Sequence, residues 1–129
     1  MLKVLPIQTK EEQENICKAC GIPFLADLLA YAATVDGELV GVCQFEIKPD
    51  GGRIHNISSA EGKDDFEAMF IMGRATLNFI DLCGVHRAFC LDESIDKILA
   101  KAIGFAPNSD GILEMDLTHF FEHPCSHKH

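Results

Sequence analysis

The chain has 129 residues, an apolar fraction of 47% and a formal net charge of −9. Its length suits one domain, and its apolar content is that of a folded globular protein rather than a disordered one. Eleven basic residues against twenty acidic ones argue against a nucleic-acid binder, which needs a positive surface, and against an anionic membrane surface. Small molecules or a basic partner suit this charge better.

Nothing in the sequence predicts a membrane span or a signal peptide. No run approaches the roughly 18–20 continuous apolar residues of a span, and the start at 1–8 is too short for a signal peptide. We therefore expect a cytoplasmic protein with reduced cysteines. Cys43, Cys83 and Cys90 lie inside apolar runs, so we expect them in the core.

The chain begins with a short apolar strand at 2–7 and a helix at 10–20. Thr9 and Glu12 form a capping box, in which each side chain can bond a free backbone N–H at the helix start. A further helical turn is expected at 24–29. These signals place one helix between the first two strands.

The next stretch predicts three strands, at 29–35, 38–48 and 53–59. Asp-Gly at 36–37 separates the first two, and this pair is the strongest short signal for a hairpin. Pro-Asp-Gly-Gly at 49–52 is a second turn. We therefore expect an antiparallel meander of three strands.

The longest predicted helix runs from 65 to 83, where Gly84 ends it. Its polar residues fall in one narrow strip, and these are Glu67, Arg74, Asn78 and Asp81. Apolar side chains cover the rest, so this helix should form the core. It follows a strand and a polar loop at 60–64, which is the order of a phosphate cradle, because N–H groups at a helix start are unpaired and partly positive.

A strand at 86–91 follows this helix. A helix connects it to the strand at 53–59, so the two strands should be parallel. The predicted fold class is α/β (α+β), with a mixed sheet in which a meander precedes a β-α-β-α-β order. One domain should span 1–129, with a tail at 118–129 that could be flexible.

A second helix should run to about Ile103, with Asp92 or Ser94 as its cap. A loop at 105–111 then leads to a final strand at 112–117. These elements give the chain two helical crossovers after the meander.

Three stretches, together with this order of elements, resemble the GNAT superfamily of N-acetyltransferases. Val-Asp-Gly-Glu-Leu-Val-Gly at 35–41 resembles the family's second hairpin, strand–loop–helix at 53–84 its acetyl-CoA motif, and Ala-Ile-Gly-Phe at 102–105 its closing Gly-Phe. The likeness covers most of the chain. It implies a GNAT-type N-acetyltransferase with acetyl-CoA as co-substrate and a small-molecule or peptide amine as acceptor.

In that family the pantetheine arm lies between the fourth strand and a splayed fifth strand, and the pyrophosphate lies on the loop and helix start. The usual signature, Gln/Arg-x-x-Gly-x-Gly/Ala, fits best as Lys-x-x-Phe-x-Ala at 63–68, and a second register is Ser-x-x-Gly-x-Asp at 59–64. The resemblance therefore implies seven cofactor-binding residues, namely Ile57, Ser58, Ser59, Lys63, Asp64, Asp65 and Phe66.

The sequence departs from the family pattern at two functional places. Phe66 replaces the first glycine of the signature, and Asp64, Asp65 and Glu67 crowd the helix start with negative charge that would repel a pyrophosphate. Ala100 stands where many members carry the tyrosine that protonates the leaving thiolate. These departures predict the alternative, a catalytically inactive GNAT-like binding or interaction module.

Two side chains are candidates for the base that acyl transfer to an amine requires. His55 lies on the strand at 53–59, and Glu46 lies on the neighbouring strand. The alternative for both is an ordinary polar residue on a half-exposed strand.

A Cys-x-x-Cys at 17–20 closes a helix, whereas a redox pair would open one. As a metal half-site it needs two more ligands, and the tail offers His119, His123, Cys125, His127 and His129. The spacing matches no standard finger, so no metal site is predicted, although a metal-binding form of the module would use these residues.

Phe120 and Phe121 follow the final predicted strand. Two neighbouring aromatic side chains would prefer to be covered. They predict a homodimer that forms through this strand.

Overall fold

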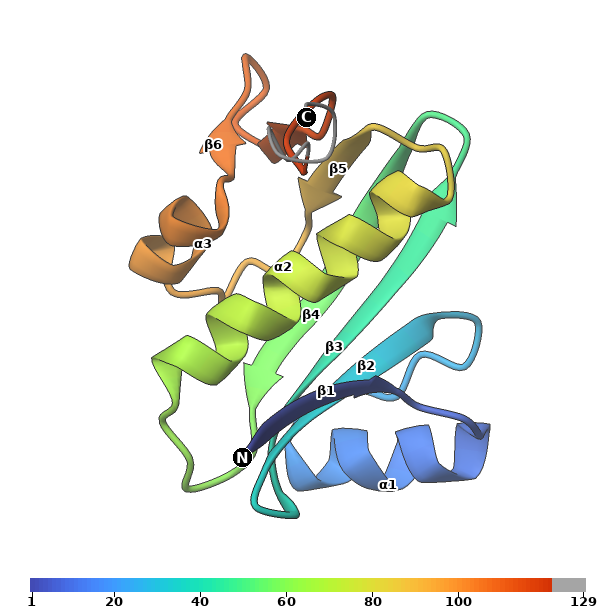
Figure 1. The fold of residues 1–129 in the computed structure, drawn as a ribbon, viewed down its shortest axis with the longest axis vertical. Helices are drawn as coiled ribbons and strands as arrows, with labels where there is room; N and C mark the ends of the chain where they lie inside the picture. Colours follow the sequence, from blue (N-terminus) through green and yellow to red (C-terminus); the bar gives the residue numbers. More distant parts are fainter. Residues whose placement is uncertain (122–129) are drawn as a thin grey trace, which may run out of the picture.

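A computed structural model describes residues 1–121. Its elements, in chain order, are β1 (Leu2–Pro6), α1 (Lys10–Ala19), β2 (Leu29–Val35), β3 (Glu38–Lys48), β4 (Gly51–Ser59), α2 (Phe66–Leu82), β5 (Arg87–Cys90), α3 (Lys97–Ile103), β6 (Ala106–Pro107) and β7 (Leu113–Asp116). All strands join one sheet in the order β1-β2-β3-β4-β5-β7-β6 (Figure 1). Within these residues, no helix has both the length and the apolar character needed to cross a bilayer.

The sheet is mixed, as predicted. β1 to β4 pair in antiparallel fashion, β4 and β5 are parallel, and β7 is antiparallel to both β5 and β6. The β2–β3 hairpin turns at Asp36 and Gly37, whose φ angles are 53° and 84°. Positive φ at both central residues is what this tight turn requires, and it explains the Asp-Gly signal.

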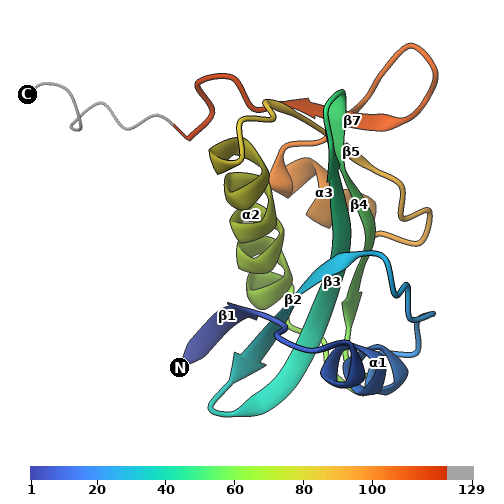
Figure 2. The ribbon, with the colours of Figure 1, turned by 90° about the vertical axis from the view of Figure 1, so that its right-hand side faces the viewer.

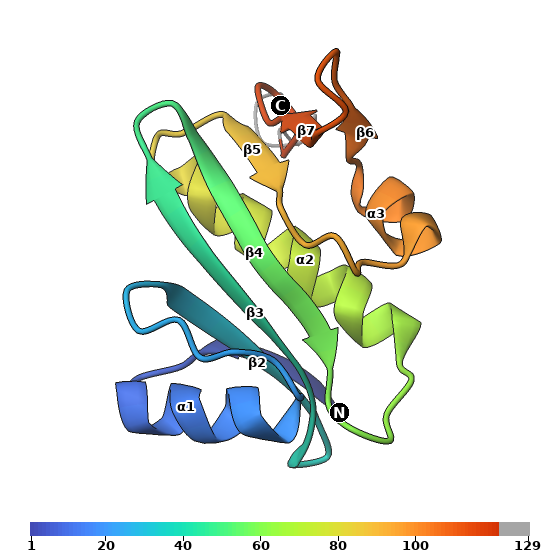
Figure 3. The ribbon, with the colours of Figure 1, turned by 180° about the vertical axis from the view of Figure 1, so that it is seen from behind.

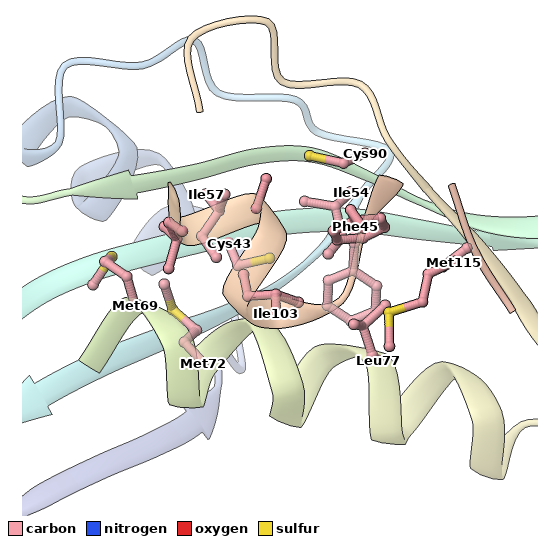
Figure 4. Close-up of a cluster of buried hydrophobic side chains, with 14 of the residues drawn as sticks. Cys43, Phe45, Ile54, Ile57, Met69, Met72, Leu77, Cys90, Ile103 and Met115 are labelled. Carbon is pink, nitrogen blue, oxygen red and sulfur yellow. The ribbon is translucent and has the colours of Figure 1, made fainter. Parts of the chain in front are cut away.

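α2 packs along one face of the sheet and forms the core, which confirms the prediction for this helix. Met72, Leu77 and Ile80 are fully buried, and they meet Phe45 of β3 and Ile54 of β4 (Figure 4). Residues of α3 and β7 complete this cluster. α2, which connects β4 to β5, therefore fixes the position of β4. This strand carries several residues of the candidate site.

α1 covers the other face of the sheet (Figures 2 and 3). Between them lies a buried amide network, in which Gln44 of β3 accepts from Gln13 Nε2 (2.9 Å) and Leu25 N (3.0 Å). Gln44 also donates to Pro23 O (2.9 Å) and to Asn56 Oδ1 (2.8 Å). This glutamine thus supplies hydrogen bonds that tie a loop to the sheet.

Several expectations from the sequence were wrong. The stretch 24–29 holds only one hydrogen-bonded turn, from Leu28 N to Leu25 O (3.0 Å), rather than a helical segment, and β2 already begins at Leu29. Asp96, rather than Asp92 or Ser94, caps α3, and its Oδ1 accepts from Ile98 N (2.7 Å) and Leu99 N (3.2 Å).

Cys83 is exposed beyond the end of α2, whereas Cys43 and Cys90 are in the core as expected. The predicted loop at 105–111 contains the short strand β6. β6 has only two residues, which is too short for an alternating apolar pattern to show in the sequence.

The end of the chain bears on two further predictions. β7 lies between β5 and β6, and β6 covers its outer edge at Leu113 and Glu114. The homodimer stays a prediction. Phe120 and Phe121 stack edge to face, and Phe120 also contacts Arg74 of α2. The tail ligands His123, Cys125, His127 and His129, and the predicted flexible tail beyond residue 121, lie outside the described residues.

Candidate functional site

The first part of the candidate site is the place where β4 and β5 separate. The two strands pair only from Gly52–Ala88 to Ile54–Cys90, and the next hydrogen bond, from Leu91 N to Ile54 O (2.8 Å), ends the ladder. β4 continues to Ser59 without β5 beside it (Figure 3). Beyond Ile54, β4 therefore keeps β3 on one side and has no strand on the side where β5 lay.

A β-bulge lies at this point of separation. Gln44 is opposite Asn56 and Phe45 is opposite Ile54, so His55 is the extra residue of β4. Bulges bend a strand and change the direction of its side chains. Here the bulge places His55 where β4 leaves β5.

The structure brings the two candidate bases together. His55 Nε2 lies 2.5 Å from Glu46 Oε2, and both side chains are about a quarter exposed. The hydrogen bond from His55 lowers the pKa of Glu46, with a smaller contribution from the charge of Lys48. Glu46 is therefore the acceptor, which holds the proton on Nε2 and leaves Nδ1 as the basic atom of the ring.

Asp92 closes part of the gap between β4 and β5. Its side chain is buried, and Oδ2 accepts from Ile57 N (3.0 Å). Its other oxygen accepts from Ser94 N (3.0 Å) and Ser94 Oγ (2.7 Å). One of the β4 donors that face the gap is therefore already bonded to a carboxylate. Sequence reasoning gave Asp92 only a capping role, although a polar residue directly after a buried parallel strand is where ligands often bind.

The helix start holds another carboxylate. Asp65 Oδ1 accepts from Ala68 N (2.9 Å) and caps α2. Lys63 forms an ion pair with Glu38 at the surface. Phe66 is 46% exposed, so its ring does not fill the space below the helix start. Gly62 has open space where a Cβ would lie.

These observations test whether acetyl-CoA suits the residues present. A pantetheine arm suits the gap, because Ser58 and Ser59 lie on the part of β4 that pairs with β3 but has no strand on its β5 side. A pyrophosphate does not suit the helix start, because Asp65 already bonds the N–H of Ala68. A phosphate beside that carboxylate, with Asp64 next to it, would be repelled. The helix start therefore does not fit the pyrophosphate in its present form.

The candidate site also includes a cavity of about 780 Å³ beyond the end of β5. Three segments line it, namely 90–95 after β5, the flank of α3, and the chain around β6 and the start of β7. Ala100 lies on the α3 flank and is buried. His55 and Glu46 are not among its lining residues, so the structure brings the two bases together outside this cavity.

The sequence alone finds no match among models of known protein families or among curated proteins. The structure does find similar proteins. An IAA acetyltransferase from Bacillus cereus superimposes with a TM-score of 0.71 at 17% identity, over 91% of this chain and all of that one. The PaiA N-acetyltransferase from Thermoplasma acidophilum, solved with coenzyme A, has a TM-score of 0.71 at 11% identity, over 90% of this chain and 99% of that one.

A GNAT family acetyltransferase from Elizabethkingia anophelis, solved with acetyl-CoA bound, has a TM-score of 0.67 at 13% identity. It matches over 90% of this chain and 98% of its own length. The chain has the GNAT fold. At these identities the likeness is one of fold. Two of the similar proteins were solved with coenzyme A or acetyl-CoA bound.

Position 100 matters for catalysis in the GNAT family. By the resemblance in sequence, this is the place of the tyrosine that many members carry, and the structure shows that it borders the cavity. Alanine has only a methyl group there, so the side chain offers no proton donor and leaves space. The acid of a GNAT reaction must come from elsewhere, if this chain catalyses one.

Three of the cysteines in the described part of the chain have thiols with raised pKa values. Burial raises the pKa of Cys43 to about 12 and that of Cys90 to about 11, which makes them poor nucleophiles. Burial, together with the nearby Cys17, raises the pKa of Cys20 to about 11. In this part of the chain, no group of three or more His, Cys, Asp or Glu side chains is placed to hold a metal ion.

Proposed function

We propose that this chain is a GNAT-type N-acetyltransferase, which transfers an acetyl group from acetyl-CoA to an amine. The observation that carries the proposal is the separation of β4 and β5 directly after the Ile54–Cys90 pair. It leaves one edge of β4 without a neighbouring strand, beside the core helix of a GNAT fold. The neighbouring acetyltransferases support the same assignment.

His55 is the base in this proposal, and Glu46 positions it. The 2.5 Å contact between Nε2 and Glu46 holds the imidazole ring, so that Nδ1 can take the proton of an acceptor ammonium or amine. Glu46 stays ionised because the hydrogen bond from His55 lowers its pKa. His55 lies at the bulge, where the two strands separate, and this position supports the proposed role.

The donor half of the proposal is tested by calorimetric titration with acetyl-CoA and with CoA. The useful variant is Asp65→Ser, because serine also caps helices well and keeps α2 intact. A unit charge about 6 Å from a phosphate repels it by about 2–3 kcal/mol at an effective dielectric constant of about 20, and exposure reduces this. We therefore expect Asp65→Ser to tighten binding about tenfold. Asp96→Ser, at the cap of α3, is the matched control and should change nothing.

The outcome separates the proposal from its rival. Binding that tightens in Asp65→Ser, together with acetylation of any amine in a substrate screen, supports the transferase. If neither wild type nor Asp65→Ser binds acetyl-CoA at millimolar concentration, the transferase proposal fails.

The second candidate is a GNAT-fold binding or interaction module without catalysis. The capping of α2 by Asp65 favours it, as does Ala100 in the place of the usual acid. Such a module would keep the cavity beyond β5 and lack acetyl-CoA binding. Cys17 and Cys20 would contribute to its metal-binding form only together with tail residues, and metal analysis of untagged protein purified without added zinc tests that form.

A further inference from the structure

The cavity beyond β5 has mostly apolar walls. Cys90, Ile95, Ala100, Phe105, Ile112 and Leu113 line it. Its volume of about 780 Å³ falls within the range of small-molecule sites, about 300–1,000 Å³. Ala100 contributes only a methyl group to the wall that α3 forms.

Charged groups lie at two separate parts of the cavity wall. Lys97 and Lys101 are one turn apart on α3, so they project from the same flank. Neither lysine forms an ion pair with another of the described residues. Asp92 and Glu93 follow β5 and line the wall there. Two cations thus lie on α3 and two anions lie at the strand end, although the chain as a whole is strongly acidic.

The two acidic residues differ in what they can offer. Both oxygens of Asp92 already accept hydrogen bonds, from Ile57 and Ser94, so Asp92 contributes charge rather than a free acceptor. Glu93 is exposed and forms no ion pair within the described part of the chain. An ammonium group would therefore bind Glu93 directly, within the field of Asp92.

From this arrangement we infer that the cavity binds an apolar amino acid in its zwitterionic form. The carboxylate meets Lys97 and Lys101, the ammonium meets Glu93, and the apolar side chain occupies the space beside Ala100 and Phe105. A polyamine or an aminoglycoside would meet the two lysines with charges of the same sign. The inference concerns binding alone and goes beyond the proposed function, because His55 and Glu46 are not among the lining residues of this cavity.

The test is calorimetric binding to the full chain without any acyl donor. Three ligands of similar shape test the two charged groups one at a time. L-phenylalanine carries both groups, phenethylamine lacks the carboxylate, and 3-phenylpropanoate lacks the ammonium. We expect L-phenylalanine to bind about tenfold more tightly than either analogue, as one or two charge-assisted contacts are lost with each group.

Variants assign the preference to residues. Lys97→Gln/Lys101→Gln should remove the advantage of L-phenylalanine over phenethylamine, while phenethylamine binds as before. Glu93→Gln should remove the advantage of L-phenylalanine over 3-phenylpropanoate. Lys18→Gln changes an exposed lysine at the end of α1 and should alter neither ratio. All four positions are exposed, so the variants should fold, which thermal denaturation checks.

The results distinguish this inference from the proposed function. Equal affinity for the three ligands, or unchanged ratios in Lys97→Gln/Lys101→Gln, would overturn it even if another amine is acetylated. Conversely, selective binding of L-phenylalanine together with no acetylation of any amine in the substrate screen would uphold the cavity inference and count against the transferase.

Discussion

The buried Gln44 network allows a quantitative test of how α1 and its loop are attached to the sheet. The perturbation is Gln44→Met, which keeps the length of the side chain and removes its amide. Gln44 is fully buried, and its amide makes four hydrogen bonds between 2.8 and 3.0 Å. The substitution therefore leaves several groups without their partner at once.

The expected cost follows from what those groups can do instead. Gln13 Nε2 keeps a weaker bond to Leu25 O (3.4 Å), and Pro23 is exposed enough to be hydrated. Leu25 N and Asn56 Oδ1 lose their partner in a part-buried setting. At about 1–3 kcal/mol for each group left unsatisfied, partly offset by the apolar methionine, we expect a loss of about 3 kcal/mol.

Urea denaturation at neutral pH measures this change as a free energy of unfolding. A loss of about 3 kcal/mol should lower the melting temperature by about 10 °C for a chain of this length. Gln13→Met/Gln44→Met removes both members of one bond, so it should cost about 1–2 kcal/mol less than the sum of the single variants.

The control is Gln8→Met, which changes an exposed glutamine. We expect it to remain within about 0.5 kcal/mol of wild type. If Gln44→Met were as mild as this control, the network would not hold the loop as we argue.

Two further predictions concern titrating groups. The pKa of Glu46 is lowered by its bond to His55, so its contribution to stability is present above the unfolded value of about 4.3 and is lost as the pH falls through the lowered folded value. The difference in unfolding free energy between wild type and Glu46→Gln should thus shrink in acid, and a constant difference would contradict this. Among described thiols, exposed Cys83 should be alkylated first in native protein, while Cys43 and Cys90 react only after unfolding. Peptide mass mapping after brief iodoacetamide treatment measures this order, and early labelling of Cys43 would refute it.

The parts of the fold that the sequence predicted well are those with strong local signals. The Asp-Gly turn at 36–37 fixes its hairpin through two positive φ angles. The apolar character of α2 predicted its place in the core, although Ile71 and Leu82 on this helix are exposed. Two features depended on distant residues instead. β6 pairs with β7 over two residues only, and Gln44 is buried because α1 lies over it.

The cap of α3 shows the same limit inside the candidate site. Asp92, Ser94 and Asp96 all precede the helix within five residues, and the local preference for a cap suits each of them. Asp92 is not the cap because Ile57 N, in a strand 35 residues away in sequence, takes its carboxylate. The choice among the three was therefore made by tertiary structure, and the sequence could not reveal it.

Two carboxylates, one at the start of α2 and one in the gap between β4 and β5, also explain why the fold is easier to assign than the activity. Asp65 bonds the N–H of Ala68 at the helix start, and Asp92 bonds the N–H of Ile57 on β4. Both donors lie along the path that the family resemblance gives to acetyl-CoA, one at its pyrophosphate and one at its arm. In each place a carboxylate accepts the hydrogen bond of the backbone donor. The same two bonds must be weakened before a phosphate or a pantetheine amide can take those donors. The hydrogen bonds of Asp65 and Asp92 therefore satisfy the backbone of the fold but compete with ligand binding.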